Sequence, residues 1–171
     1  DRAFPIHLNE IIVEKAIAYR ARGVVGIDIA GPESPAFHPA DYKRQFDRAR
    51  RKGLGITVHT GESGTVDEIA EVVRYLEPSR IGHGVKAAFD PRTMHMIRER
   101  NITLEVCPTS NLNTRVVADW DEAAHILQVL PMAAIGDDAA TYVNLITGPR
   151  GPEDADGPEE LHVVMLDGGR A

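Results

Sequence analysis

A histidine and a carboxylate lie close together at the end of one short apolar run. His59 closes the β-branched run in Ile56-Thr-Val-His-Thr-Gly-Glu62, and Glu62 follows it across a glycine-containing turn. A neutral imidazole at a strand end is a rigidly held metal ligand, and a partly desolvated carboxyl group can donate a proton near neutral pH. An isolated histidine is more often an ordinary core or surface residue, and an isolated glutamate a solvated loop charge. Their combination in one turn favours a reactive site.

A second histidine and a pair of aspartates extend this pattern. His83 lies between two glycines, which allow a sharp turn and leave room for a ligand against the imidazole. Asp137 and Asp138 follow an apolar run, so that one carboxylate can face a metal while the other faces a substrate. The alternatives are a turn histidine and an acidic pair in a solvated loop.

The elements that must position these residues alternate along the chain. Apolar runs predict strands over residues 24–30, 56–59, 81–83, 102–107 and 131–136. Helical periodicity and capping residues predict helices over residues 9–22, 40–52, 65–76, 90–100 and 122–130. Such alternation is typical of parallel strands joined by right-handed crossovers. A doubly wound open sheet fits it too, but polar groups at successive strand ends favour an α/β barrel, which builds its active site there.

Composition limits the classes of protein that fit. The chain has 171 residues, of which 43% are hydrophobic and 26% charged. This length suffices for one domain with a core but is short for a complete eight-fold barrel, which takes roughly 250 residues. The net charge of −7 argues against a nucleic-acid or anionic-membrane partner. No apolar run approaches the roughly 20 residues of a membrane span and no signal peptide opens the chain, so we expect a cytoplasmic protein.

Five segments together resemble the adenosine deaminase family of zinc-dependent amidohydrolases. They are Gly26-Ile-Asp-Ile-Ala-Gly-Pro-Glu33, Val58-His-Thr-Gly-Glu62, Arg80-Ile-Gly-His-Gly84, Cys107-Pro-Thr-Ser-Asn111 and, less closely, Ile135-Gly-Asp-Asp138. The specific part of the likeness is His-Thr-Gly-Glu followed by Ile-Gly-His-Gly in this order and spacing. The resemblance implies a (β/α)8 TIM barrel, of which this chain, as a fragment without the first strands, carries roughly the fourth to eighth β/α units.

The resemblance also implies catalytic and metal-binding roles. His59 would be a zinc ligand and Asp137 the last zinc ligand. Glu62 would protonate the purine ring nitrogen next to the reacting carbon, and His83 would orient the attacking water and shuttle its proton. The implied reaction is the hydrolytic deamination of adenosine or a related 6-aminopurine compound by a zinc-activated water.

Two further residues would contact the substrate. The resemblance assigns a backbone N–H donor to Gly31 and a hydrogen bond with the far side of the base to Asp138. The expected partner is therefore a small-molecule purine nucleoside or base. Alternatives within the family are adenine deaminase and aminodeoxyfutalosine deaminase. From other classes, the chain fits a catalytically silent barrel domain that binds a nucleoside or a partner protein, or a gene remnant that does not fold stably.

The chain departs from the family pattern at points that bear on activity. The family takes two further zinc ligands from a His-x-His motif, which this sequence lacks. We therefore expect the isolated chain to bind zinc poorly and to be inactive. Pro32 stands where the family usually has an acid, and Ala139 where it usually has a proline. The short interval between Trp120 and Asp137 raises the hypothesis that the end of the chain is read out of frame.

The sequence divides the chain into a barrel part and a tail. Residues 1–147 carry the elements of the barrel. Residues 148–171 are rich in glycine, proline and acid, without periodicity, and predict a disordered tail. An incomplete barrel leaves strand edges and apolar faces uncovered, so we expect this chain to oligomerise or aggregate on its own.

Overall fold

The centre of the fold is a sheet of parallel strands that follow one another in chain order. The computed structural model describes residues 1–32, 36–134, 142–148 and 160–166. Within them the parallel strands are β1 (Gly26–Ile29), β2 (Gly55–Thr60), β3 (Arg80–His83) and β4 (Thr103–Val106). The order is that of successive β/α units, and the chain is an α/β protein that forms part of a TIM barrel.

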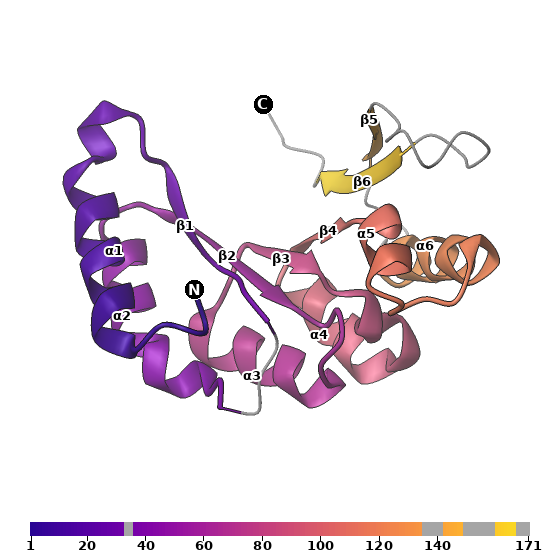
Figure 1. Ribbon diagram of the computed structural model, residues 1–171, viewed down its shortest axis with the longest axis horizontal. Coiled ribbons are helices and arrows are strands. Elements are labelled where there is room, and N and C mark those ends of the chain that lie inside the picture. The colour runs from indigo at the N-terminus through magenta and orange to yellow at the C-terminus, as the bar shows by residue number, and fades with distance from the viewer. Residues whose placement is uncertain (33–35, 135–141, 149–159, 167–171) are drawn as a thin grey trace.

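Helices separate these strands. They are α1 (Ile6–Ala18), α2 (Pro39–Arg51), α3 (Val66–Leu76), α4 (Pro91–Glu99), α5 (Pro108–Asn113) and α6 (Trp120–Ala134), with short 3₁₀ turns η1 (Arg20–Arg22) and η2 (Val85–Phe89). Figure 1 shows α2, α3 and α4 along the same side of the sheet. Proline lies in the first turn of α2, α4 and α5. Before α4, Asp90 also caps the helix by accepting a hydrogen bond from the Thr93 N–H at 3.0 Å.

One face of the sheet is covered and apolar. The strand register places Ile29 beside Val58, Val58 beside Ile81 and Ile81 beside Leu104, and all of these side chains are buried. Because strand residues alternate between faces, their neighbours form a second row on the opposite face. That row places His59 beside Gly82 and Gly82 beside Glu105; Gly82 is buried, whereas His59 and Glu105 are half-buried. The register thus puts Asp28, His59 and Glu105 on the less covered face, whereas the polar Thr60 and His83 continue the buried row at the strand ends.

The end of the described chain departs from the predicted alternation. Residues 131–134 continue α6 through Pro131, so the strand predicted there is wrong for these residues. Two further strands follow, β5 (Tyr142–Gly148) and β6 (Glu160–Leu166), and they pair with each other antiparallel. β6 also pairs antiparallel with β4, so the parallel pattern stops at β4 (Figure 1). Residues 160–166, within the predicted tail, therefore form a strand.

No helix in the described part of the chain is both long enough and apolar enough to cross a membrane.

Candidate functional site

Four of the six predicted site residues line one cavity at the carboxyl ends of β1 to β3. The cavity has a volume of about 260 Å³ and is lined by Arg2, Gly31, Pro32, His59, Thr60, Glu62, Ser63 and His83. Gly31 follows β1, His59 lies near the end of β2, Glu62 in the turn after β2, and His83 ends β3. The remaining two, Asp137 and Asp138, lie outside the described residues. The strands thus bring the predicted residues together at the end where barrels place their active sites.

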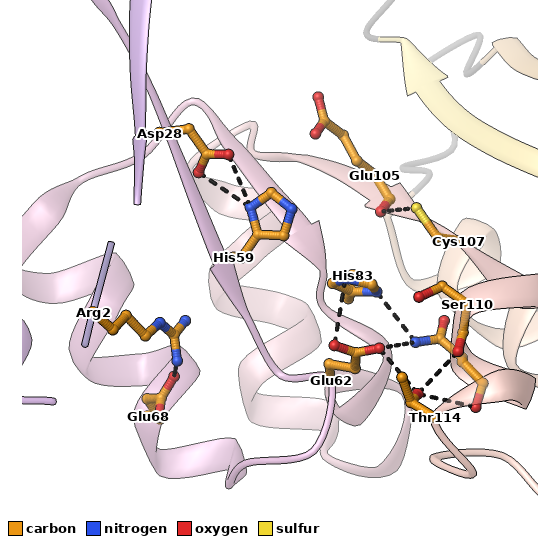
Figure 2. A network of polar contacts seen from close by, with 11 residues as sticks. Arg2, Asp28, His59, Glu62, Glu68, His83, Glu105, Cys107, Ser110 and Thr114 are labelled. Atoms are coloured by element: carbon orange, nitrogen blue, oxygen red, sulfur yellow. Dashed lines mark hydrogen bonds and ion pairs between the residues drawn. The ribbon is translucent and has the colours of Figure 1, made fainter. Parts of the chain in front are cut away.

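The imidazole of His59 is held by a carboxylate from the neighbouring strand. Its Nδ1 lies 3.1 Å from Oδ1 and 3.0 Å from Oδ2 of Asp28 in β1 (Figure 2). The hydrogen bond to Asp28 raises the pKa of His59 above its usual value, against the lowering effect of burial, and the charges of Asp28 and Glu105 add to the rise. A carboxylate on one ring nitrogen fixes the ring orientation, as is common for histidines that bind metals. Sequence reasoning missed Asp28, although an acid inside an apolar strand was the available signal.

The space beside His59 depends on a glycine of the next strand. Gly82 lies directly opposite His59 in the register of β2 and β3. A Cβ at Gly82 would stand 2.7 Å from Cγ of the His59 ring, which is closer than carbon atoms approach. The sequence suggested that the glycines around His83 make room for a ligand. The structure shows that Gly82 makes room for the other histidine.

His83 and Glu62 meet in the lining of the cavity. Nε2 of His83 lies 3.5 Å from Oε2 of Glu62, and the rings of His59 and His83 meet edge to face with their centroids 5.5 Å apart. The backbone of His83 has a φ of 64°, in the left-handed region that residues other than glycine rarely adopt. Such strain persists only where surrounding contacts hold it, and it is concentrated at functional sites.

Two side chains from the segment after β4 complete the surroundings of Glu62. Asn111 of α5 places Nδ2 3.3 Å from Oε1 of Glu62 and 3.1 Å from Nδ1 of His83. The hydroxyl of Thr114 lies 3.1 Å from the same Oε1 and 2.9 Å from the Ser110 carbonyl oxygen, so its one hydrogen is shared between two acceptors (Figure 2). Sequence reasoning quoted Asn111 within a motif but gave it no role, and it missed Thr114. No local pattern connects these residues to Glu62, because the contact spans about a third of the chain.

A buried ion pair braces the other side of the cavity. Nη1 of Arg2 lies 3.1 Å from Oε1 of Glu68, and its side chain is 1% exposed. The same Glu68 oxygen accepts a hydrogen bond of 2.8 Å from the hydroxyl of Thr60, the residue after His59. The backbone N–H of Arg2 donates to Ala30 at 2.9 Å, next to Gly31. Arg2, which sequence reasoning missed, therefore connects the ends of β1 and β2 with the start of α3.

The described residues supply part of a metal site. His59 fits a metal ligand, since Asp28 occupies Nδ1 and the ring lines the cavity. However, no group of three histidine, cysteine, aspartate or glutamate side chains in the described ranges is arranged to hold a metal ion. A catalytic zinc site usually takes three protein ligands. The described residues therefore do not by themselves fit a complete zinc site.

A family model and the relatives of known name point to the same protein family. The family model of adenosine deaminase matches residues 3–138. An adenosine deaminase of Clostridium kluyveri is 40% identical over 121 residues, which are 71% of this chain and 34% of the relative. An adenine deaminase of a Chelativorans species is 39% identical over 118 residues, 67% of this chain and 36% of the relative. The chain thus spans about a third of the length of these relatives.

One solved structure and a second family model also match this chain. The crystal structure of an amidohydrolase from Burkhoderia ambifaria with bound zinc superposes with a TM-score of 0.67 at 28% identity, covering 79% of this chain and 37% of that one. The family model of the LUD domain matches residues 112–166 and overlaps the end of the first match. A match to a protein family in the printed reading frame argues against the hypothesis that this part of the chain is read out of frame.

Proposed function

Because the chain belongs to the adenosine deaminase family, we propose that its cavity is the proton-transfer part of a site that hydrolytically deaminates a 6-aminopurine compound. The observation that carries the proposal is that Glu62 and His83 meet in the lining of one cavity, with Nε2 of His83 and Oε2 of Glu62 3.5 Å apart. A carboxyl group and an imidazole in this relation can divide the work of general acid and general base. The named activities of the relatives, adenosine deaminase and adenine deaminase, support this substrate class.

Each residue of the cavity has a definite task in this proposal. Glu62 donates a proton to the purine ring nitrogen beside the carbon that carries the amine. His83 orients the water that adds to this carbon, gives its Nε2 proton to the departing ammonia, and takes up the proton of the added water on the same nitrogen. The backbone N–H of Gly31, which lines the same cavity, hydrogen-bonds the purine. Proton delivery by a positioned side chain contributes about 10²- to 10⁴-fold to the rate.

The proposal includes zinc as the metal, in keeping with the solved amidohydrolase that holds it. When bound, zinc supplies hydroxide near neutral pH by lowering the pKa of its water toward about 7. In this chain His59 is the proposed ligand among the described residues, and Asp28 orients it through Nδ1. Asp137 as a further ligand and Asp138 as a contact to the base remain proposals from the sequence, since both lie outside the described residues.

One observation favours a second candidate, a barrel domain that binds a nucleoside without turning it over. The described residues do not gather three metal ligands, as a catalytic zinc site requires. Ammonia release from adenosine and adenine, measured with and without a chelator, separates the two candidates. Release that the chelator abolishes supports the enzyme. Nucleoside binding without ammonia release supports the silent domain.

Replacing Glu62 by Gln tests the assignment of the proton donor. The amide keeps the size and polarity of the side chain but cannot donate a carboxylic proton. In the full-length protein that contains this chain, we expect the rate of ammonia release to fall by about 10²- to 10⁴-fold. Glu71→Gln is the matched control, because Glu71 is an exposed residue of α3 outside the cavity lining. Turnover that survives Glu62→Gln unchanged would exclude Glu62 as the acid.

A further inference from the structure

We infer that Asn111 is a positioning residue that joins Glu62 to His83 and sets the tautomer of His83. Its amide nitrogen Nδ2 lies within hydrogen-bond distance of both groups, 3.3 Å from Oε1 of Glu62 and 3.1 Å from Nδ1 of His83. Asn111 is 1% exposed, so these contacts are formed away from water. The catalytic consequence of this inference rests on the proposed function, but the tautomer is a property of the chain itself.

The chemistry of the three groups fixes the orientation of the amide. An ionised carboxylate only accepts hydrogen bonds, so the amide must turn its NH2 group, not its oxygen, toward Glu62. The NH2 group has two hydrogens, and the two acceptors within reach, Oε1 of Glu62 and Nδ1 of His83, match that number. An Nδ1 that accepts a hydrogen bond carries no proton. In its neutral form the His83 ring therefore holds its proton on Nε2, the nitrogen that faces Oε2 of Glu62.

The same contacts make the two oxygens of Glu62 different. Oε1 accepts from Nδ2 of Asn111 and also lies 3.1 Å from the Thr114 hydroxyl, whose single hydrogen it shares with the Ser110 carbonyl oxygen at 2.9 Å. A proton on the carboxyl group therefore resides on Oε2, the oxygen toward His83. When Glu62 gives this proton to the substrate nitrogen, an N–H bond forms, the O–H bond of Oε2 breaks, and the carboxylate is left with the Asn111 amide already donating to Oε1. Donors placed in advance where charge develops lower the barrier without rearrangement.

The amide also carries an energetic cost that its packing does not explain. Its carbonyl oxygen Oδ1 is buried and has no hydrogen-bond partner among the described residues. A buried acceptor without a partner destabilises the folded chain. A residue kept only for packing would not need this group, whereas one that bridges Glu62 and His83 needs the NH2 that comes with it.

The test reads the His83 tautomer directly by NMR. Two-bond ¹H–¹⁵N correlation spectra of the full chain, recorded at alkaline pH, distinguish a ring protonated on Nε2 from one protonated on Nδ1. The His83 signals are identified as those lost in His83→Asn, a substitution that suits the left-handed backbone there. We expect the neutral ring to carry its proton on Nε2. A ring protonated on Nδ1 in the unsubstituted chain would overturn the inference, since the amide would then face the other way.

Asn111→Asp provides the decisive variant. Aspartate has the shape of asparagine, but its carboxylate accepts and does not donate, so Nδ1 of His83 must supply the proton. We expect the tautomer to invert to Nδ1–H. Asn113→Asp is the matched control, because it makes the same change at an exposed position of the same helix, and it should leave the tautomer unchanged. An unchanged tautomer in Asn111→Asp would contradict the inference. If that variant does not fold, the spectrum of the unsubstituted chain still decides.

Kinetics separates this inference from the proposed function. In the full-length protein, misplacing Glu62 and His83 through Asn111→Asp should lower kcat by about 10²-fold. KM should change much less, because Asn111 is not among the residues that line the cavity. If the protein releases no ammonia but the tautomer inverts as expected, the proposed function fails and the positioning role stands. If the full-length protein releases ammonia but the unsubstituted His83 ring carries its proton on Nδ1, the positioning role of Asn111 fails and the proposed function stands.

Discussion

Gly82 is the residue whose lack of a side chain most directly shapes the site. The ring of His59 occupies the volume that a Cβ at position 82 would fill, at 2.7 Å from its Cγ. We expect Gly82→Ala to push His59 away from Asp28 and to lower the free energy of unfolding by about 1–3 kcal/mol, the usual cost of overpacking. Urea unfolding of the chain measures this cost.

Gly55→Ala is the control for that substitution. Gly55 also lies in a parallel strand, but a Cβ there would meet its nearest neighbour, the Val25 carbonyl oxygen, at 3.6 Å, an ordinary contact. Its effect on unfolding should be the smaller of the two. Equal losses in both variants would show that the crowding at His59 is relieved without cost, and that Gly82 does not define the position of the ring.

Residue types and spacing indicated three candidate site residues but not the residues that hold them in place. Glu62, His59 and His83 stood out because their side chains can do chemistry and follow apolar runs. Asp28 and Asn111 hold them from other strands and helices, and such contacts have no local signature. Asp28 in particular lies within the apolar run that predicted the strand over residues 24–30, and the structure leaves it exposed on the less covered face. Whether a strand has one covered face depends on which helices pack on it.

At the scale of elements, capping residues predicted the starts of α3 and α4 but not that of α1, which begins at Ile6 and not at residue 9. The helix predicted over residues 65–76 starts with Thr65 three residues before Glu68, the spacing of a capping box, and the Thr65 hydroxyl does accept from the Glu68 N–H at 3.2 Å. The side chain of Glu68 binds Arg2 and Thr60 instead of returning to Thr65. The backbone half of the motif is local and was predictable. The contacts of the Glu68 side chain depend on residues from other parts of the fold, so they were not predictable from the local sequence.

At the end of α6 the prediction from the sequence was wrong. The run Pro131-Met-Ala-Ala-Ile-Gly136 was interpreted as a strand because it is a short apolar run that ends at Asp137 and Asp138. The helix nevertheless continues to Ala134. Short apolar runs do not distinguish a strand from a buried helical turn, and alanine and methionine favour the helix.

The cap of α4 makes a prediction about pH. Hydrogen bonds from the Thr93 hydroxyl and then from its backbone N–H lower the pKa of Asp90 below its ordinary value. A carboxyl group with a lowered pKa in the folded state stabilises the fold above its unfolded pKa, and this contribution is lost as pH falls through the folded pKa. Asparagine caps helices about as well as aspartate but does not ionise. The Tm of the unsubstituted chain should therefore exceed that of Asp90→Asn at neutral pH, and this difference should shrink as the pH falls into the acid range.

A thermal melt series between neutral and strongly acidic pH measures this difference. The control is Asp121→Asn, in the first turn of α6, for which no comparable loss of the Tm difference is expected. A Tm difference for Asp90→Asn that stays constant through the acid range would show that the Asp90 charge contributes nothing to the cap.

At the scale of the whole molecule, two family patterns meet. The adenosine deaminase match ends at residue 138 and the LUD domain match begins at residue 112. In the structure the change falls after β4, where an antiparallel pairing with β6 replaces the parallel one that a barrel would continue. We propose that the barrel part ends between these limits, before the boundary at residue 147 that composition suggested. Composition gave a later limit because the segment before the Gly/Pro-rich stretch is as apolar as a barrel strand.

The other end of the sheet predicts how the chain behaves in solution. In the described sheet β1 is an edge strand, and Val25 beside it is 81% exposed. The neighbouring helix α1 exposes Leu8, Ile11 and Ile12, at the helical spacing of one face. An open edge beside an apolar helix face favours pairing with another copy of the same surface. We therefore expect residues 1–171 to associate in a concentration-dependent way.

Sedimentation velocity across a dilution series measures that association. Ile11→Gln combined with Ile12→Gln should shift the distribution toward monomer, because it removes the apolar surface and leaves the helix intact. Lys15→Gln, on an exposed position of the same helix, should not. A chain that stays monomeric at every concentration would show that the exposed apolar face of α1 does not drive self-association. Association that ignores both isoleucine substitutions would instead place the contact elsewhere, at the edge of β1 or beyond the parallel sheet.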